Sequence, residues 1–121
     1  MEWEIEYYQK ENGEIPVEDF LLTLNPGLRA KAYSDITLLK RLGINIRAPY
    51  STPIKGKKYK GLFELRTKFS SDITRIFYFL FEKNTFILLH GFVKKTNKTP
   101  TKELEQALKY KLDYERRCQD E

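Results

Sequence analysis

The pattern of apolar and polar positions in the first 43 residues predicts one strand followed by two helices. Near the N-terminus, Trp3, Ile5 and Tyr7 alternate with glutamates, which is the period of a half-buried strand. Farther on, Pro16 suits the first position of one helix, and Asn25 can cap a second. The apolar residues at helical spacing are Val17, Phe20, Leu21 and Leu24 in the first helix and Leu28, Ala32, Ile36, Leu39 and Leu42 in the second, which Gly43 can end.

The next segment, residues 44–69, reads as a loop that leads into an amphipathic strand. Two prolines and a glycine between residues 44 and 60 favour a loop, with a short strand near residues 52–55. From Leu62 onward the pattern has a period of two, with apolar residues and Thr67 on one side and charged residues on the other. A strand with one buried and one polar face is therefore expected.

Two nearly apolar segments follow, residues 73–81 and 85–93, and they are typical of strands covered on both faces. Short turns separate these strands from each other and from the preceding one, so hairpins and an antiparallel sheet are expected. Arg75 is anomalous within its apolar segment. Its position marks it for closer attention.

A last helix is predicted to open at Thr99 and Pro100. Its expected buried face holds Leu104, Ala107, Leu108 and Leu112, and Glu105 can pair with Lys109 one turn later. The element order is then strand, two helices, a short strand, three strands and a helix. This order indicates an α+β protein with one domain over residues 1–121.

Composition supports a folded domain, because 40% of the residues are hydrophobic and 14% are aromatic. The longest nearly apolar segment, residues 76–81, is far too short to span a bilayer. The N-terminal residues lack the features of a signal peptide, and the single Cys118 cannot form an internal disulfide. A cytoplasmic protein with no membrane partner is expected.

Charge is distributed unevenly along the chain. Residues 1–19 contain one lysine and seven acidic residues, whereas residues 55–100 contain eleven lysines and arginines and three acidic residues. A concentrated basic segment with interleaved aromatic residues is typical of a surface that binds phosphates or an acidic partner. The alternative is a solvated lysine-rich face without a partner.

Several kinds of chemistry do not fit this sequence. One histidine and one cysteine cannot form a zinc-binding cluster, and no phosphate-binding glycine loop is present, so neither a metal nor a cofactor is predicted. A nucleophilic pair of Cys118 and His90 is formally possible, but the cysteine lies in a charged C-terminal tail. What remains is a group of cationic side chains: Lys55, Lys57, Lys58, Arg66, Lys68, Arg75, His90, Lys94 and Lys95.

Cationic side chains of this kind can cleave RNA without a metal. The ribose 2′-hydroxyl is an internal nucleophile, so the protein has to align it, move its proton and stabilise charge on the phosphate. Arginine suits the last task because its planar guanidinium can contact two phosphate oxygens and stays charged.

Three sequence blocks carry a family resemblance: GLFELR at residues 61–66, RIFYF at 75–79 and LLHGFVKKTNKTP at 88–100, followed by Glu103 and Ala107. In this order and spacing the chain resembles the HigB-like, phage-derived branch of the RelE/ParE toxin superfamily. The resemblance is strongest over residues 61–108.

The resemblance implies a RelE-like fold, in which a curved antiparallel sheet is joined by an N-terminal helical pair and a C-terminal helix. It also implies an mRNA interferase, an endoribonuclease that enters the ribosomal A site, cleaves messenger RNA by 2′-hydroxyl attack and thereby inhibits translation. The expected partner is a cognate antitoxin with a helix-turn-helix DNA-binding domain.

By position, the resemblance assigns phosphate contact and transition-state stabilisation to Arg66 and Arg75. The candidate catalytic residues are Arg66, Arg75, Lys68 and His90, and the candidate RNA-binding residues are Lys55, Lys57, Lys58, Phe92, Lys94 and Lys95. Where some relatives have a tyrosine, Phe92 has no ionisable hydroxyl and can only stack. Proton transfer then falls to Lys94, Lys95, His90, a tyrosine elsewhere or no residue at all.

Two of these residues have structural alternatives. His90 lies between apolar neighbours and, by simple alternation, shares the strand side of Leu88 and Phe92, so it can be a core residue. Arg75 can pair with a buried carboxylate such as Glu64. Two other functions also stay open: a ParE-like toxin that binds DNA gyrase, and a non-enzymatic module that binds RNA or an acidic helix.

Overall fold

A computed structural model describes residues 3–119 of the chain. The elements are β1 (Glu4–Tyr7), α1 (Pro16–Leu22), α2 (Pro26–Leu42), the 3-10 helix η1 (Gly43–Asn45), β2 (Ser51–Pro53), the 3-10 helix η2 (Lys57–Tyr59), β3 (Leu62–Phe69), β4 (Asp72–Phe81), β5 (Thr85–Val93) and α3 (Thr101–Gln119). The predicted α+β class and element order are confirmed. None of the helices between residues 3 and 119 has the length and apolar character that crossing a bilayer requires.

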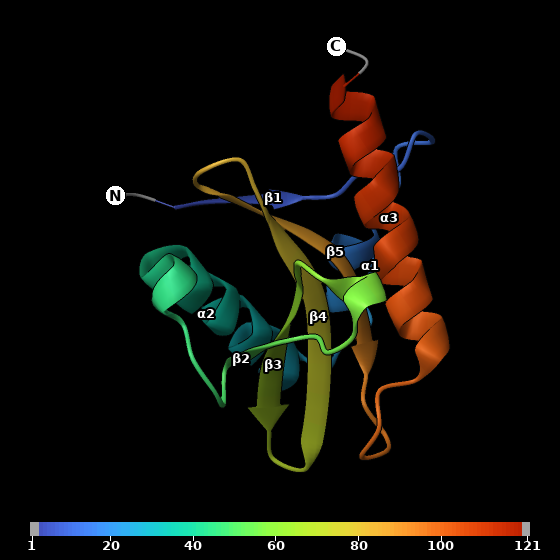
Figure 1. Ribbon diagram of the computed structural model, residues 1–121. Coiled ribbons are helices and arrows are strands. Elements are labelled where there is room, and N and C mark those ends of the chain that lie inside the picture. The colour runs from blue at the N-terminus through green and yellow to red at the C-terminus, as the bar shows by residue number, and fades with distance from the viewer. Residues whose placement is uncertain (1–2, 120–121) are drawn as a thin grey trace.

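The five strands form one sheet in the order β1-β5-β4-β3-β2 (Figure 1). Strands β2 to β5 are antiparallel, as predicted, but β1 runs parallel to β5, with Glu4 opposite Thr85 and Tyr7 opposite Leu88. The expectation of an antiparallel sheet was therefore wrong for β1, and the sheet is mixed. Hairpin turns fix the direction of successive strands only, and β1 pairs with a strand that lies far away in sequence.

Helices α1 and α2 cover one face of the sheet, and α3 covers part of the other (Figure 1). The predicted apolar stripes of α1 and α2 are confirmed, because their inward residues pack on Leu65, Ile76 and Tyr78. Asn25 caps α2 by accepting a hydrogen bond of 2.9 Å from the Leu28 amide. These contacts support β3 and β4 from the α1 and α2 side of the sheet.

The buried face of α3 differs from the predicted one. Leu112 is 55% exposed, whereas Tyr110 and Tyr114 pack with Leu104 and Ala107 against the sheet. The prediction considered aliphatic residues only and therefore placed the buried face wrongly. The two tyrosines bury their rings and leave their hydroxyl groups available for polar contacts.

Strand β5 carries a β-bulge that changes which side chains share a face. Opposite the adjacent pair Phe77 and Tyr78 of β4 lie His90 and Leu88, so Leu89 is an extra residue. As a result, Leu88 packs under α1 and α2, while His90 and Phe92 lie on the α3 side. The expectation that His90 shares a side with Leu88 was wrong, because simple alternation cannot register an inserted residue.

Candidate functional site

Three rows of side chains cross β3, β4 and β5 on the α3 side of the sheet. The strand register places Glu64, Phe77 and His90 in the first row, Arg66, Arg75 and Phe92 in the second, and Lys68, Ile73 and Lys94 in the third. Lys94 joins the third row because its amide donates to the Ile73 carbonyl over 2.9 Å. The sheet thus gathers five of the predicted catalytic and RNA-binding cations and Phe92 on one surface.

Helix α3 covers only one side of these rows. Its first turn meets the first row through Glu103 and His90, and farther along the helix Tyr114 packs edge-on against Phe79 and Phe81. The second and third rows lie beyond the start of the helix. We call their cations, Arg66, Lys68, Arg75 and Lys94, together with Glu64, the open end.

Arg75 forms an ion pair with Glu64 at the centre of the open end. Its Nη1 lies 3.3 Å from Glu64 Oε1, and the two side chains are only 12% and 11% exposed. Burial lowers the pKa of Arg75, Glu64 opposes that shift and Arg66 adds to it. The predicted structural alternative for Arg75 is confirmed, yet its Nε and Glu64 Oε2 are buried without a hydrogen-bond partner. The pair therefore keeps unused hydrogen-bonding capacity.

Arg66 lies directly opposite Arg75 and is half-buried. Within residues 3–119 its guanidinium makes no hydrogen bond or ion pair, although its amide donates to the Tyr50 carbonyl over 2.8 Å. Behind it, the Thr67 hydroxyl donates to the buried Asp35 carboxylate over 2.8 Å. The backbone is thus held on both sides while the guanidinium stays available for an anion.

Lys94 is close enough to feel the other charges of the open end. Burial, Arg75 and Arg66 lower the pKa of its ammonium group, and Glu64 partly opposes them. The pKa of Lys94 is thus shifted in the direction that favours proton transfer from a lysine.

His90 is both packed and hydrogen-bonded. Its Nε2 lies 2.9 Å from Glu103 Oε1, and its ring stacks on Phe77 and Phe92 with centroids 6.5 and 6.4 Å apart. The Tyr110 ring approaches it edge-on at 6.1 Å. Glu103 was not predicted as a site residue. A glutamate in the first turn of the helix that follows a histidine-bearing strand is the one signal that could have suggested it.

Phe92 is 7% exposed, and its ring stacks on Phe77 at 5.5 Å. It supports the ring of His90 from the second row. Stacking of Phe92 on an RNA base stays a prediction, and it requires a movement that uncovers the ring.

The lysines of the loop before β3 have different surroundings. Lys58 pairs with Glu105 of α3 over 2.8 Å, and the Tyr59 hydroxyl donates to the same carboxylate, so η2 is tied to α3. This contact replaces the predicted pairing of Glu105 with Lys109. Lys55 and Lys57 are exposed in the same loop, and Lys95 is exposed after β5. None of the three belongs to the rows.

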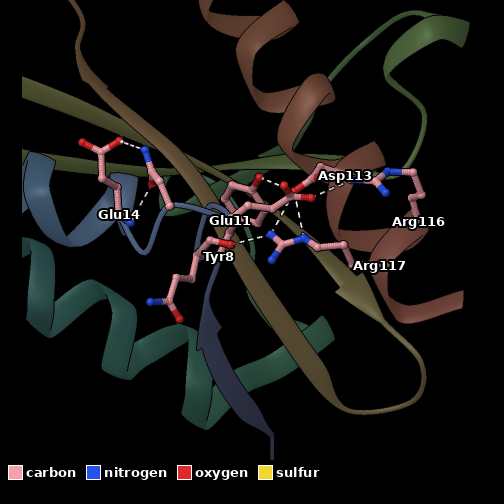
Figure 2. Close-up of polar contacts among 8 residues, drawn as sticks. Tyr8, Glu11, Glu14, Asp113, Arg116 and Arg117 are labelled. Atoms are coloured by element: carbon pink, nitrogen blue, oxygen red, sulfur yellow. Dashed lines mark hydrogen bonds and ion pairs between the residues drawn. The ribbon is translucent and has the colours of Figure 1, made fainter. Parts of the chain in front are cut away.

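The C-terminal half of α3 is anchored to the segment after β1. Asp113 accepts hydrogen bonds from the Tyr8 hydroxyl over 2.6 Å, from Arg116 over 2.7 Å and from Arg117 over 3.0 Å (Figure 2). Arg116 also lies 3.3 Å from Glu11. We call these five residues the paired end. This anchor ties the C-terminal half of the helix to the segment after β1.

Other features do not add to the open end. Within residues 3–119 no cluster of three or more His, Cys, Asp or Glu side chains could hold a metal ion. A largely apolar cavity of about 300 Å³ lies on the α1 and α2 side, lined by residues that include Ile46, Phe63 and Phe86. It is separated from the cations by the sheet.

Comparison with known families gives one match. The model of the family described as phage derived protein Gp49-like (DUF891) matches residues 19–111, which include all three rows and Glu103. No curated protein matches the sequence. The matched segment covers most of the chain, and the chain belongs to the Gp49-like phage-derived family, a family associated with RelE/HigB-like toxins.

Proposed function

We propose that this protein is the HigB-like toxin of a type II toxin–antitoxin pair and that it cleaves messenger RNA. The observation that carries the proposal is the surplus of positive charge at the open end, where the strand register gathers four cations and one carboxylate on the same surface. A half-buried arginine without an ion-pair partner, directly opposite a second arginine, suits a phosphate group.

The reaction is a transesterification within the RNA. The ribose 2′-oxygen bonds to the adjacent phosphorus, and the bond from phosphorus to the 5′-oxygen breaks. The products are a 2′,3′-cyclic phosphate and a 5′-hydroxyl. Arg66 and Arg75 stabilise the negative charge that builds on the non-bridging oxygens, where one well-placed donor is worth about 3 kcal/mol.

Lys94 is the proton donor to the leaving 5′-oxygen. Its lowered pKa makes its ammonium group a stronger acid than that of an ordinary lysine. Its position in the third row puts it beside the arginines without a direct carboxylate partner among residues 3–119. The other proton, that of the 2′-hydroxyl, needs a separate acceptor.

The same charge surplus suits the proposed partners. Messenger RNA in the ribosomal A site presents phosphates to the open end, while Lys55, Lys57 and Lys95 extend the basic surface for RNA or ribosome contact. A cognate antitoxin with a helix-turn-helix domain would place an acidic segment on the open end and also bury apolar surface. Salt then weakens the complex only in part.

Induced expression in bacteria, followed by mapping of transcript ends, tests the proposal. We expect growth arrest and new 5′-hydroxyl ends within coding sequences. Arg66→Ala is expected to lower cleavage by roughly a hundredfold or more without a change in thermal melting. Arg116→Ala is the matched control, because Arg116 lies at the paired end, and it is expected to cleave as the wild type does.

Two other outcomes contradict the proposal. Growth arrest with DNA damage signalling and intact transcripts would identify a ParE-like toxin that binds gyrase. No arrest and no cleavage, with RNA binding that weakens as salt rises, would identify a binding module without catalysis.

A further inference from the structure

We propose that His90 and Glu103 form a dyad in which Glu103 orients His90 to accept the proton of the attacking 2′-hydroxyl. The inference rests on the proposed function and supplies the proton acceptor that it lacks. His90 Nε2 lies 2.9 Å from Glu103 Oε1. A carboxylate at this distance holds the proton of a neutral imidazole on Nε2, which leaves Nδ1 as an acceptor.

The Nδ1 atom of His90 is not fully buried. It makes no hydrogen bond within residues 3–119, and it is not among the buried side-chain atoms that lack a partner. The His90 and Glu103 side chains are each 18% exposed. One nitrogen is thus held by the protein, and the other can meet a substrate.

Aromatic contacts keep the imidazole from turning over. Phe77 and Phe92 stack on the ring with interplanar angles of 17° and 19°, and Tyr110 meets it at 71°. A flip would exchange Nε2 and Nδ1, and it would break the hydrogen bond to Glu103. A proton acceptor held in one orientation is what efficient proton transfer requires.

The dyad lies on the opposite side of the arginines from Lys94. His90, Phe92 and Lys94 follow one another on the same side of the chain, and two residues of a strand span about 6.6 Å, so His90 and Lys94 are about 13 Å apart along the backbone. Arg75 lies between them, opposite Phe92. In an in-line displacement, the attacking and leaving oxygens lie on opposite sides of phosphorus, so acceptor and donor have to flank the phosphate.

The proton balance closes with these two groups. The 2′-hydroxyl proton moves to His90 Nδ1 as the bond from oxygen to phosphorus forms, and Glu103 stabilises the resulting imidazolium. Lys94 gives one proton to the 5′-oxygen as that bond breaks. Exchange with water returns both side chains to their starting states.

The chain has a single histidine, so nitrogen-15 NMR of the labelled protein observes His90 without an assignment problem. At a pH where the imidazole is neutral, we expect the Nε2–H tautomer to dominate in the wild type. Glu103→Ala should give a mixture of tautomers, and Glu103→Gln should retain more of the Nε2–H form. Glu115→Gln is the control on the same helix, where Glu115 pairs with Lys111, and it should leave the spectrum unchanged.

Cleavage assays on ribosome-bound messenger RNA test the catalytic role. We expect His90→Ala to lower kcat by roughly a hundredfold and Glu103→Ala by about tenfold or more, with little change in KM. The double variant should be no slower than His90→Ala, because Glu103 acts through His90. Glu103→Gln gives the same test if Glu103→Ala does not fold.

Three results would overturn the dyad. One is an unchanged tautomer in both Glu103 variants, and another is a double variant whose loss equals the product of the single losses. The third is a His90→Ala variant that cleaves as fast as the wild type while Arg66→Ala is inactive. This result would contradict the dyad but not the proposed function. Absence of cleavage by the wild type removes both.

Discussion

The two ends of the α3 side of the sheet hold the same kinds of charged residue, but the charges balance at one end and leave a positive surplus at the other. At the paired end, Arg116 and Arg117 meet Asp113, and Arg116 also meets Glu11 (Figure 2). At the open end, Glu64 pairs with Arg75 and interacts with Lys94, while Arg66 and Lys68 form no ion pair among the described residues. Neutralised cations hold a helix in place, whereas surplus cations are available to bind an anion.

The difference also appears in what the charges do to their neighbours. At the paired end, the Tyr8 hydroxyl bond and the arginines lower the pKa of Asp113, so opposite charges stabilise one another. At the open end, Arg75 and Arg66 help to lower the pKa of Lys94, so like charges destabilise one another. A folded protein that keeps such repulsion has a reason beyond stability, and a bound phosphate would relieve it.

Arg75→Ala is expected to have the largest effect, because Arg75 has two roles: it contacts the proposed phosphate and it neutralises the buried Glu64. It removes a phosphate contact, which lowers cleavage by roughly a hundredfold or more. It also leaves Glu64 buried without a partner, which lowers the free energy of unfolding by about 3 kcal/mol. Urea denaturation and the transcript-cleavage assay measure the two losses separately.

The double variant Arg75→Met with Glu64→Gln sharpens this prediction. It removes both charges of the pair, so we expect most of the stability to return while cleavage stays lost. Recovery of cleavage in this variant would show that Arg75 acts only as the partner of Glu64.

Asp113→Ala is expected to have the next largest effect, and it tests the paired end. The loss of hydrogen bonds from Tyr8, Arg116 and Arg117 should lower the free energy of unfolding by about 2 kcal/mol. Cleavage measured well below the melting temperature should stay within about threefold of the wild type. A loss of cleavage as large as that of Arg66→Ala would break the distinction between the ends.

Much of this arrangement could be predicted from the sequence. The period-two pattern of residues 62–69 placed Glu64, Arg66 and Lys68 on one face, and the structure confirms that placement. Arg75 stood out as a charge in an apolar strand, and its pairing with Glu64 is confirmed. These predictions succeeded because alternation along a regular strand is a local property.

The remainder depended on contacts between distant segments. The bulge at Leu89 moves His90 to the face of the arginines, and the alternation of side chains along β5 does not reveal it. The bond from His90 to Glu103 depends on where α3 crosses the sheet, which the packing of Leu104, Ala107 and Tyr110 on the sheet helps to set. Packing across the fold, rather than local pattern, therefore completed the candidate site.

Tyr8→Phe is expected to change the alkaline stability of the protein. Burial, followed by the bond to Asp113 and its charge, raises the pKa of Tyr8 from 10.0 to about 12. Because the folded-state pKa is raised, this stabilisation is present below pH 10 and is lost as the pH rises from 10 to about 12. Removing the hydroxyl should reduce the slope of unfolding free energy against pH in that window by up to about 1.4 kcal/mol per unit.

Urea denaturation at several alkaline pH values measures that slope. Tyr50→Phe removes an exposed hydroxyl elsewhere on the surface, and it should leave the slope as it is. An unchanged slope in Tyr8→Phe would show that the bond to Asp113 does not persist in solution.

Lys68→Ala is expected to have the smallest effect, and it compares the two ends through RNA binding alone. Lys68 is exposed in the third row of the open end, so its loss should weaken single-stranded RNA binding only a few-fold and reduce the slope of log affinity against log salt by about 0.7. Lys109 is equally solvent-facing on α3, near Asp113 of the paired end, and Lys109→Ala should change neither quantity. Fluorescence anisotropy with a labelled oligonucleotide at several salt concentrations distinguishes the two variants.

If both variants reduce the slope by the same amount, RNA binding depends on the net charge of the whole protein. If only Lys68→Ala reduces the slope, RNA binds at the local surplus of cations, because the two lysines carry the same charge and differ only in their neighbours.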